Sequence, residues 1–410
     1  MPDDAGPIRL AEAISILGTE IGSIDRTEQV PLPAADGRVL AGSVSSERAQ
    51  PHYRRASRDG YAVRAADTAD PPNTLSPTEG PVGAGEAARV HTGSAVPAGA
   101  DSVVMIEEAR ETEAGVEIAE AAEAGQHVVP VGADLEAGRP LFERGHRLRP
   151  GDLGALKIAG MRSVAVLERP EVAVVPTGEE LVQSDPGPGQ AVETNGLVGS
   201  RQVRRWGGQP RYRDVVTDDE TAIRAAIERD LDADLVVTTG GSSVGARDLL
   251  PRVIADRGEV LVDGMAIRPG GTAGLGVVEG TPIAMLPGTP VASLVLGWLL
   301  LRPALQRALG TPPASPPSVA AELEAPIESR GGRRTVHGIE LESTEQGTPL
   351  ARKADGHGLP SLSGIDGWLQ VSEEAQSLGA GRSVTVEQWG TLPAQSEADW
   401  ENSSRNEETR

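Results

Sequence analysis

The segment 235–250, LVVTTGGSSVGARDLL, carries the residues of this chain best suited to chemistry. A β-branched run leads into a turn rich in glycine and serine, and a helix pattern begins near Arg247, which predicts a buried strand, a tight turn and a helix start. Glycine lets the backbone approach a ligand closely, and free N–H groups at a helix start favour phosphate or another oxyanion. Asp248 then favours a divalent cation that bridges its carboxylate to phosphate. By itself, however, such a loop is more often an ordinary strand-to-helix turn.

Three more loops with unusual residues follow predicted strands in the same region. They read TGEE, RPGG and PGTP, at 177–180, 268–271 and 287–290. Strands and helices alternate here, as in a doubly wound parallel sheet, where ligands bind outside the carboxyl ends of the strands. We therefore expect all four loops to lie at one edge of the sheet. Within this region, 217–220 has the form of a capping box, and Thr289 is expected to be the N-cap of a hydrophobic helix.

Changes of pattern along the 410 residues predict a multidomain α/β protein. We expect a discontinuous N-terminal domain that contains a β-rich insert, then an α/β domain, a small β domain and a disordered acidic tail. In that order the ranges are 1–50 with 141–170, 51–140 for the insert, 171–310, 319–390 and 391–410.

Composition excludes several classes of function. Acidic residues outnumber basic ones 60 to 38, and the net charge of −22 argues against a nucleic-acid surface. The absence of cysteine excludes disulfides, thiolate metal sites and cysteine nucleophiles. The best apolar run, 291–301, is shorter than the ~20 residues of a membrane span, so we expect a cytoplasmic protein without a membrane partner. The acidity fits adaptation to concentrated salt, or a GC-rich genome, or both.

Eight motifs occur in order from about residue 8 to residue 390. They are SRDGYAV, HTGSAVPAGADSVVMIEE, VGADLEAG, VVPTGEEL, ETNG, VTTGGSSVGARD, AIRPGG and MLPGTPVAS. Together they make the chain resemble the MoeA family of molybdopterin molybdenumtransferases, which is related to the gephyrin E domain. One such motif means little, whereas eight in one order are specific.

The resemblance implies both a fold and a reaction. The fold would comprise a discontinuous elongated domain, an inserted β domain, a MogA-like α/β domain and a C-terminal β barrel. The protein would be a homodimer, with each active site between the α/β domain of one subunit and the inserted domain of the other. The reaction would join molybdate, or tungstate, to adenylylated molybdopterin in the presence of Mg²⁺ and release AMP. A molybdopterin adenylyltransferase is a candidate partner.

The resemblance also assigns site residues. Four acids match acids of the family's motifs and are expected to bind the metal and to position the attacking water or oxyanion. These catalytic and metal-binding residues are Asp59, Asp134, Glu180 and Asp248. The residues expected to bind substrate are Thr92, Gly93, Thr177, Gly178, Asn195, Gly240, Gly241, Ser242, Ser243, Gly245, Arg268, Pro269, Gly270, Pro287, Gly288, Thr289 and Pro290.

The chain departs from the family's motifs mainly in its cations. The family's KPGK stretch is RPGG here, so that Arg268 replaces one lysine and Gly271 leaves a second cation absent. Gly264 replaces another cation, and Thr289 stands where the family has asparagine. Because arginine can hold phosphate or molybdate through two N–H groups, Arg268 would preserve part of the function. Restoring lysine at residue 271 is expected to be tolerated or to raise substrate affinity.

Two alternatives to the metal-inserting enzyme remain open. The missing lysines favour a divergent molybdopterin-binding or scaffold paralogue that does not insert metal. A molybdopterin adenylyltransferase is the other alternative, although the inserted and C-terminal domains suit the later step better. Retention of all four acids favours the metal-inserting enzyme.

The acidic composition predicts that salt stabilises the protein. At −22 the chain repels itself in dilute buffer, and molar salt shortens the Debye length to about 3 Å. We expect the melting temperature to rise by roughly 5 °C or more between dilute and molar potassium chloride. Differential scanning calorimetry measures this directly. A flat or falling melting temperature would mean that the acidity is compositional alone.

Overall fold

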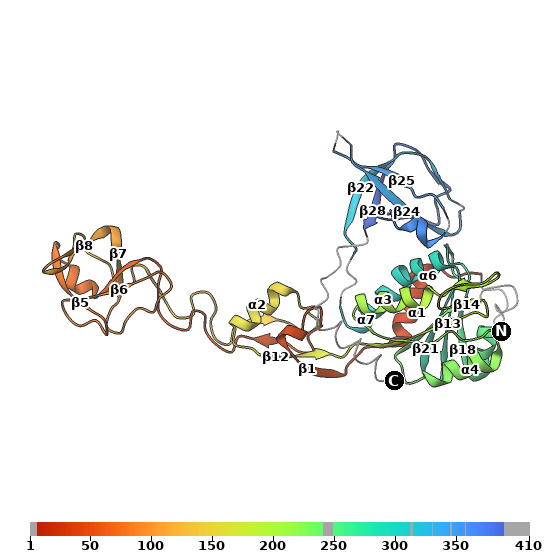
Figure 1. Cartoon of the computed structure of the whole chain (residues 1–410), viewed down its shortest axis with the longest axis horizontal. Helices are drawn as coiled ribbons and strands as arrows, with labels where there is room; N and C mark the ends of the chain where they lie inside the picture. The colour runs from red at the N-terminus through yellow and green to blue at the C-terminus, as the bar shows by residue number, and fades with distance from the viewer. Residues whose placement is uncertain are drawn as a thin grey trace. The chain divides into compact units, whose positions relative to one another are not determined.

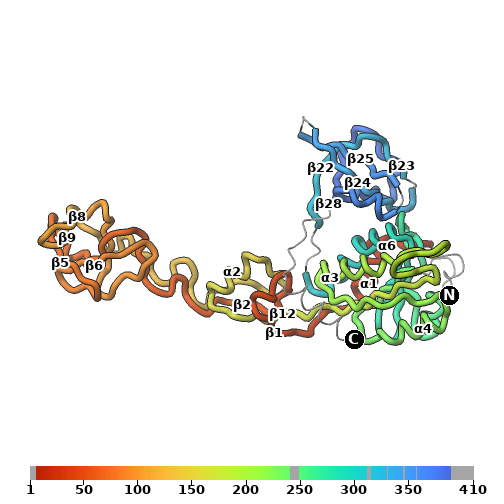
Figure 2. The backbone as a smooth tube through the Cα atoms, viewed as in Figure 1, coloured from red at the N-terminus to blue at the C-terminus, as the bar shows by residue number. Residues whose placement is uncertain are grey.

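The structure is a computed structural model that describes residues 6–240, 249–311, 315–329, 331–344, 347–356 and 358–388. The chain forms two compact units, whose elements are drawn in Figures 1 and 2. Unit 1 is Met1–Arg26 with Leu167–Arg410, and unit 2 is Thr27–Val166. No helix in the described ranges combines the length and the apolar composition that spanning a bilayer requires.

The insert in unit 2 is built on six strands in the order β7-β4-β6-β5-β9-β8. The strand β4 is buried on both faces, because Tyr61 and Val63 enter one apolar cluster while Ala62 enters another. The segment expected to be β-rich therefore consists of a two-faced sheet. Its elements are β4 Gly60–Val63, η2 Ala65–Thr68, β5 Asn73–Thr78, β6 Glu86–Val90, β7 Ser102–Met105, η3 Ile106–Glu108, β8 Ala109–Thr112 and β9 Gly115–Ile118.

The rest of unit 2 packs around helix α2, Pro150–Ile158. Leu156 of this helix is fully buried against Leu40, Leu148 and Val166. Strand β1 pairs with β12, β2 with β11 and β3 with β10, which joins segments from before and after the insert. The remaining elements are β1 Thr27–Pro31, η1 Leu32–Ala34, β2 Val44–Ser45, β3 Arg55–Ala56, β10 Val128–Val129, β11 Pro140–Phe142 and β12 Ser163–Leu167.

Unit 1 contains a second six-stranded sheet, in the order β16-β13-β17-β21-β20-β18. Its first four strands are parallel, but β20 runs against both of its neighbours, so the sheet is mixed rather than wholly parallel. The reversal follows from the two-residue turn at Glu279 and Gly280, both of which have positive φ, as the tight turns of hairpins require. The strands are β13 Glu171–Thr177, β16 Gln209–Tyr212, β17 Leu235–Gly240, β18 Gly258–Asp263, β20 Gly274–Val278 and β21 Thr281–Leu286, with the short pair β14 Leu181–Val182 and β15 Ala191–Val192 beside them.

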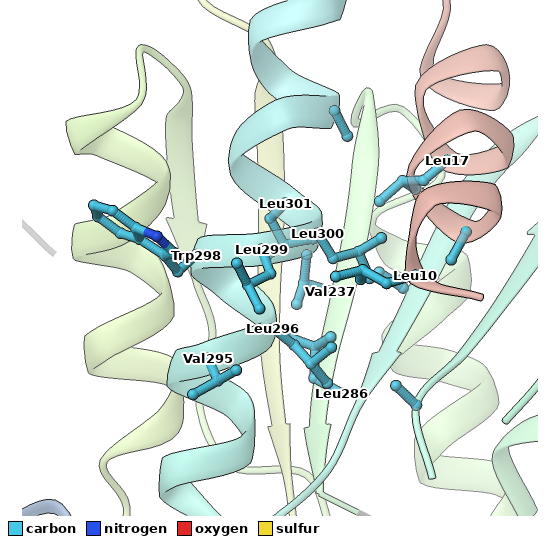
Figure 3. Close-up of a cluster of buried hydrophobic side chains, with 14 of the residues drawn as sticks. Leu10, Leu17, Val237, Leu286, Val295, Leu296, Trp298, Leu299, Leu300 and Leu301 are labelled. Atoms are coloured by element: carbon cyan, nitrogen blue, oxygen red, sulfur yellow. The ribbon is translucent and has the colours of Figure 1, made fainter. Parts of the chain in front are cut away.

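Helices cover both faces of this sheet, as in the doubly wound class that we predicted. Val172 and Val174 of β13 face a cluster with α1, α3, α6 and α7, whereas Ala173 and Val175 face α4 and α5. Figure 3 shows the first cluster, where side chains of two helical segments meet Val237 of β17. The helices are α1 Leu10–Ile21, α3 Asn195–Arg205, α4 Glu220–Arg229, α5 Leu249–Arg257, α6 Pro290–Leu296, the π-helical η4 Gly297–Leu301 and α7 Arg302–Ala308.

The N-terminal helix α1 packs in a different place from the one we expected. We grouped residues 1–50 with 141–170, but Leu10 and Leu17 of α1 are buried in the α/β cluster of unit 1 (Figure 3). Contact with α7 is close, since a Cβ on Gly18 would lie 2.8 Å from Cδ of Arg307. An apolar stripe predicts that a helix is buried, but it does not identify the surface that receives the stripe.

The start of helix α4 also differs from the capping box that we predicted at 217–220. Asp219 is the N-cap, and its Oδ1 accepts the backbone N–H of Ala222 at 2.9 Å. Thr217 instead donates its hydroxyl to Asp219 Oδ2 at 2.8 Å. A carboxylate at the N-cap satisfies a free N–H group of the first turn and interacts favourably with the helix dipole.

A closed barrel follows the α/β domain in unit 1. Strands β24-β25-β22-β28-β26 pair in that order, and β26 returns to β24. The short strand β19, Ile267–Arg268, pairs parallel with β24 and ties the barrel to the α/β domain. Trp368 strengthens this junction because it is buried in the same cluster as α6. The elements are β22 Ser318–Leu323, β23 Ile327–Glu328, β24 Arg334–Glu342, β25 Leu350–Lys353, η5 Leu359–Leu362, β26 Gly367–Val371, β27 Ser377–Leu378 and β28 Ser383–Gln388.

The cluster around η4 should dominate the stability of unit 1. Leu300 is fully buried there, so we expect Leu300→Ala to lower the free energy of unfolding by about 2–5 kcal/mol. Val192→Ala is the matched control, because Val192 of unit 1 is 42% exposed and should change stability by less than about 0.5 kcal/mol. Urea denaturation at fixed salt measures both variants. Equal losses would contradict the central place of this cluster.

Candidate functional site

Three predicted loops follow neighbouring parallel strands of unit 1 and begin at one edge. Thr177, the last residue of β13, pairs with Gly240, the last residue of β17. Thr239 pairs in turn with Leu286, where β21 ends before 287–290. The prediction that these loops share the carboxyl edge of the sheet is therefore confirmed for their starting points. The predicted residues Gly241, Ser242, Ser243, Gly245 and Asp248 lie outside the described residues.

The fourth loop reaches the same edge by another route. Arg268 follows strand β18 of the α/β sheet, as we expected, but it also lies in β19, which belongs to the barrel sheet. The segment 264–273 is nevertheless at the carboxyl edge, because Asp263 pairs with Gly274 and Gly274 pairs with Met285 near the end of β21. The strand pattern of β19 looks the same in the sequence whichever sheet it joins.

Glycine is required where the first two strands end. Gly240 has φ +130°, and a Cβ there would lie 1.9 Å from the carbonyl oxygen of Thr177. A side chain at residue 240 is thus excluded by the neighbouring strand as well as by the backbone conformation. Because the two strands approach so closely here, backbone atoms form the edge between them.

Several buried polar atoms at this edge have no hydrogen-bond partner among the described residues. They are Thr177 Oγ1, Asn195 Oδ1, Asp218 Oδ1 and Thr239 Oγ1. Leaving such atoms unpaired costs free energy, about 1–3 kcal/mol each, unless a ligand or water binds them. Asn195 is also oriented by the protein, since its Nδ2 donates to the carbonyl of Gly288 at 2.8 Å. These atoms therefore make the edge a candidate site for a polar ligand.

Asp218 and Glu180 form a carboxyl pair at the site. Burial raises the pKa of Asp218 above its ordinary value of 3.8, and the negative charges of Glu180 and Glu179 raise it further. We had assigned residue 218 to a capping box, so the sequence interpretation missed it. The available signal was the pair of adjacent acids, Asp218 and Asp219. Asp219 caps α4, so Asp218 remains available for a different role.

Glu193 is a second residue that the sequence interpretation missed. Its side chain is buried, accepts the backbone N–H of Gly196 at 2.6 Å and also accepts the hydroxyl of Tyr212. Burial and this bond raise the pKa of Tyr212 to about 12. Glu193 thereby fixes the start of α3, where Asn195 lies.

In unit 2 the structure brings together three of the four predicted residues. The backbone N–H of Thr92 donates to Asp59 Oδ1 at 2.7 Å, and that of Gly93 donates to the carbonyl of Ala56 at 2.8 Å. The bond from Thr92 lowers the pKa of Asp59, and His91, whose Nδ1 lies 3.6 Å from the carboxylate, lowers it further. Asp59 is therefore held as an ionised, exposed carboxylate on a fixed turn.

Asp134, the fourth predicted residue of unit 2, lies on a different loop. Its carboxylate is 3.9 Å from the guanidinium of Arg55, and its backbone N–H donates to Gln50 at 2.9 Å. Among the described residues, no group of three or more histidine or acidic side chains could hold a metal ion. The assignment of four acids to one metal site thus stays a prediction.

Mg²⁺ nevertheless fits the carboxyl pair of unit 1. Asp218 has a buried oxygen without a described partner and a raised pKa, and Glu180 contributes to that rise. A cation would offset the repulsion between the two groups, and Mg²⁺ uses one or two carboxylates while it keeps several waters. The donor set therefore suits a hard divalent cation.

Comparisons with known proteins match both halves of the chain. Residues 8–160 match the MoeA N-terminal region (domain I and II), and residues 173–307 match a probable molybdopterin binding domain. The chain is 33% identical to molybdopterin molybdenumtransferase 2 of Mycobacterium tuberculosis over 386 residues, 87% of this chain and 94% of the relative. It is 32% identical to molybdopterin molybdenumtransferase of Nostoc over 79% of each chain. A solved molybdopterin biosynthesis MoeA protein from Pyrococcus has a TM-score of 0.81 and 31% identity, over 94% of this chain and all of that chain.

Replacing Asp218 of the carboxyl pair should have opposite effects on the stability of the metal-free protein and on metal binding. Because the pKa of Asp218 is raised on folding, its ionised form is disfavoured in the folded state as pH rises above about 4. We expect Asp218→Asn to raise the melting temperature of the metal-free protein at pH 7, by no more than about 3 °C, and to reduce the further increase caused by magnesium chloride.

Asp219→Ala is the matched control for this experiment. It removes the N-cap of α4 and should lower stability by about 1 kcal/mol without altering the response to magnesium. Thermal melts of the three proteins between pH 4 and pH 8 provide the comparison. A magnesium response in Asp218→Asn equal to that of the parent would exclude Asp218 from the metal site.

Proposed function

The chain belongs to the molybdopterin molybdenumtransferase family, and we propose that it inserts molybdate or tungstate into adenylylated molybdopterin with release of AMP. The observation that carries the proposal is the edge of unit 1, where buried atoms of Thr177, Asn195 and Thr239 that have no partner in the described part of the chain lie among three loop starts. A polar ligand bound there would supply the hydrogen bonds that these atoms lack.

The residues of unit 1 would bind and orient the substrate. The hydroxyls of Thr177 and Thr239 can donate to phosphate or pterin oxygens, and Asn195 is held in place through Gly288. Arg268 is exposed at the same edge and can donate two parallel N–H groups to one oxyanion. Several directed donors, rather than one charge, would thus fix the substrate.

The carboxylates have separate parts in this proposal. Asp218 and Glu180 would hold Mg²⁺, which when bound offsets the negative charge of the phosphoanhydride that is cleaved. Asp59 stays ionised at neutral pH because Thr92 donates to it, so it can accept a hydrogen bond from an attacking water. Asp134 and Asp248 stay in the proposal as further candidates from the family motifs.

We also propose that the protein acts as a cytoplasmic homodimer. Support comes from large apolar side chains that are exposed beside the predicted residues in each unit. Tyr53 and Ile106 are each 36% exposed. Both lie near the Asp59 turn, because the Tyr53 hydroxyl donates to the carbonyl of Gly93 and the Ile106 N–H donates to the carbonyl of Asp59. In unit 1, Leu197 and Tyr212 are 45% and 40% exposed around the start of α3. Such side chains are typical of a surface that a second protein covers.

The scaffold alternative has one observation in its favour, which is the lack of cations at Gly264 and Gly271. The two functions differ in turnover. An enzyme releases AMP from adenylylated molybdopterin when an oxyanion is added, whereas a scaffold binds the same compound and leaves it intact. Parallel reactions with molybdate and tungstate would also define the preferred oxyanion.

We expect Glu180→Gln to lower the rate of oxyanion-dependent AMP release at least about 100-fold, because a neutral amide is a poorer Mg²⁺ ligand than a carboxylate. Asp248→Asn should behave similarly. Glu12→Gln is the control, since Glu12 is exposed on α1, and it should retain the parental rate. Chromatographic detection of AMP measures all four proteins. A parental rate in Glu180→Gln would remove this residue from the site, and no release by the parent would favour the scaffold.

A further inference from the structure

Arg333 of the barrel reaches the turn that carries Arg268. Its Nη1 lies 3.4 Å from the position that a Cβ on Gly271 would occupy. Hydrogen bonds hold the backbone on both sides of Arg333. The N–H of Gly332 donates to the backbone carbonyl of Glu373, and the N–H of Arg334 donates to that of Ala266, each at 2.8 Å. The guanidinium of Arg333 is thus placed over the 268–271 turn by barrel and α/β residues together.

The charges around this turn are unusual for a chain with a net charge of −22. Arg334, the next residue, pairs with Glu373 at 3.3 Å, but neither Arg268 nor Arg333 forms an ion pair with a described residue, and both are exposed. Arg268 begins this turn and Arg333 lies over Gly271, and neither has an acidic partner among the described residues of this strongly acidic protein. The two arginines are therefore placed as an anion-binding pair would be.

His337 lies on the same barrel strand as Arg334 and adds no positive charge to this junction. Burial, together with the charges of Lys353 and Arg268, lowers its pKa to about 4. The side chain is therefore neutral at pH 7, and its buried Nε2 has no hydrogen-bond partner among the described residues. Arginine and lysine remain the sources of positive charge at this junction.

We propose that Arg333 is a second oxyanion-binding residue of the candidate site and acts with Arg268 across the 268–271 turn. The ligand is a tetrahedral oxyanion, either free molybdate or the phosphate of a nucleotide. This inference rests on the function proposed above and adds the barrel to the residues that determine substrate affinity.

The arrangement also explains how the chain can do without a lysine at residue 271. A Cβ there would lie 3.2 Å from the carbonyl oxygen of Ile267 and 3.4 Å from Arg333, so a lysine would be crowded and would carry its ammonium beside a guanidinium. Our expectation that Gly271→Lys is tolerated or raises affinity is therefore replaced. Gain of affinity should require that Arg333 be removed first.

The test is calorimetric binding of sodium molybdate, sodium sulfate and AMP, each added alone to the full-length protein at fixed potassium chloride. Arg333→Ala should weaken binding of molybdate or AMP roughly tenfold to a hundredfold, because a charge-assisted hydrogen bond is lost, and Arg333→Lys should recover part of it. The compound whose binding is weakened by Arg333→Ala identifies the oxyanion. Arg382→Ala, at an exposed barrel arginine without a described ion pair, should bind like the parent.

Variants at residue 271 complete a double-mutant cycle. Gly271→Lys should bind no better than the parent, Gly271→Ala measures the crowding alone, and Gly271→Lys combined with Arg333→Ala should bind more tightly than Arg333→Ala. Parental affinity in Arg333→Ala, or no binding of any oxyanion by the parent, would overturn the inference. Independent effects of the two substitutions would do the same.

AMP release separates failure of this inference from failure of the proposed function. If the parent and Arg333→Ala release AMP equally, the enzyme stands and the role of Arg333 falls. If the parent releases none but loses oxyanion binding on Arg333→Ala, the binding site stands and the metal-inserting function falls. Thermal melts of each variant show whether the fold is retained.

Discussion

The register of three parallel strands is the constraint on which the site depends. Pairing of Thr177 with Gly240 and of Thr239 with Leu286 brings three loops to a common edge. That register is fixed because successive residues of each strand enter different apolar clusters, and a slip by one residue would exchange them. The interior packing of unit 1 thereby determines where loops far apart in the sequence begin.

The polar residues at this edge lower the stability of the unliganded protein. Buried oxygens of Thr177, Asn195 and Asp218 have no described partner, and Asp218 also faces the charge of Glu180. Each of these features is unfavourable in the unliganded protein and becomes favourable when a polar ligand and a cation bind. The extensive cluster around α1, α6 and η4 lies beneath the same sheet and offsets that cost.

Ion pairing in unit 1 separates structural arginines from those available to a ligand. Asp230 is fully buried, and Arg213 donates to both of its oxygens, while Arg211 lies 4.0 Å away. A buried carboxylate requires such partners, so these arginines are committed to the fold. Arg268 and Arg333 have no comparable partner among the described residues, although acids are abundant.

The sequence by itself determined the family, the alternation of strands and helices, and the loops that meet at the sheet edge, because motif order and apolar periodicity are local properties. The tertiary structure alone decided that α1 joins the α/β cluster, that Arg268 belongs to a barrel-paired strand, and that Arg333 reaches Gly271. Asp218 likewise became visible once Asp219 was seen to cap α4. Each of these depends on which surfaces meet in space, and side-chain types and spacing do not encode that choice locally.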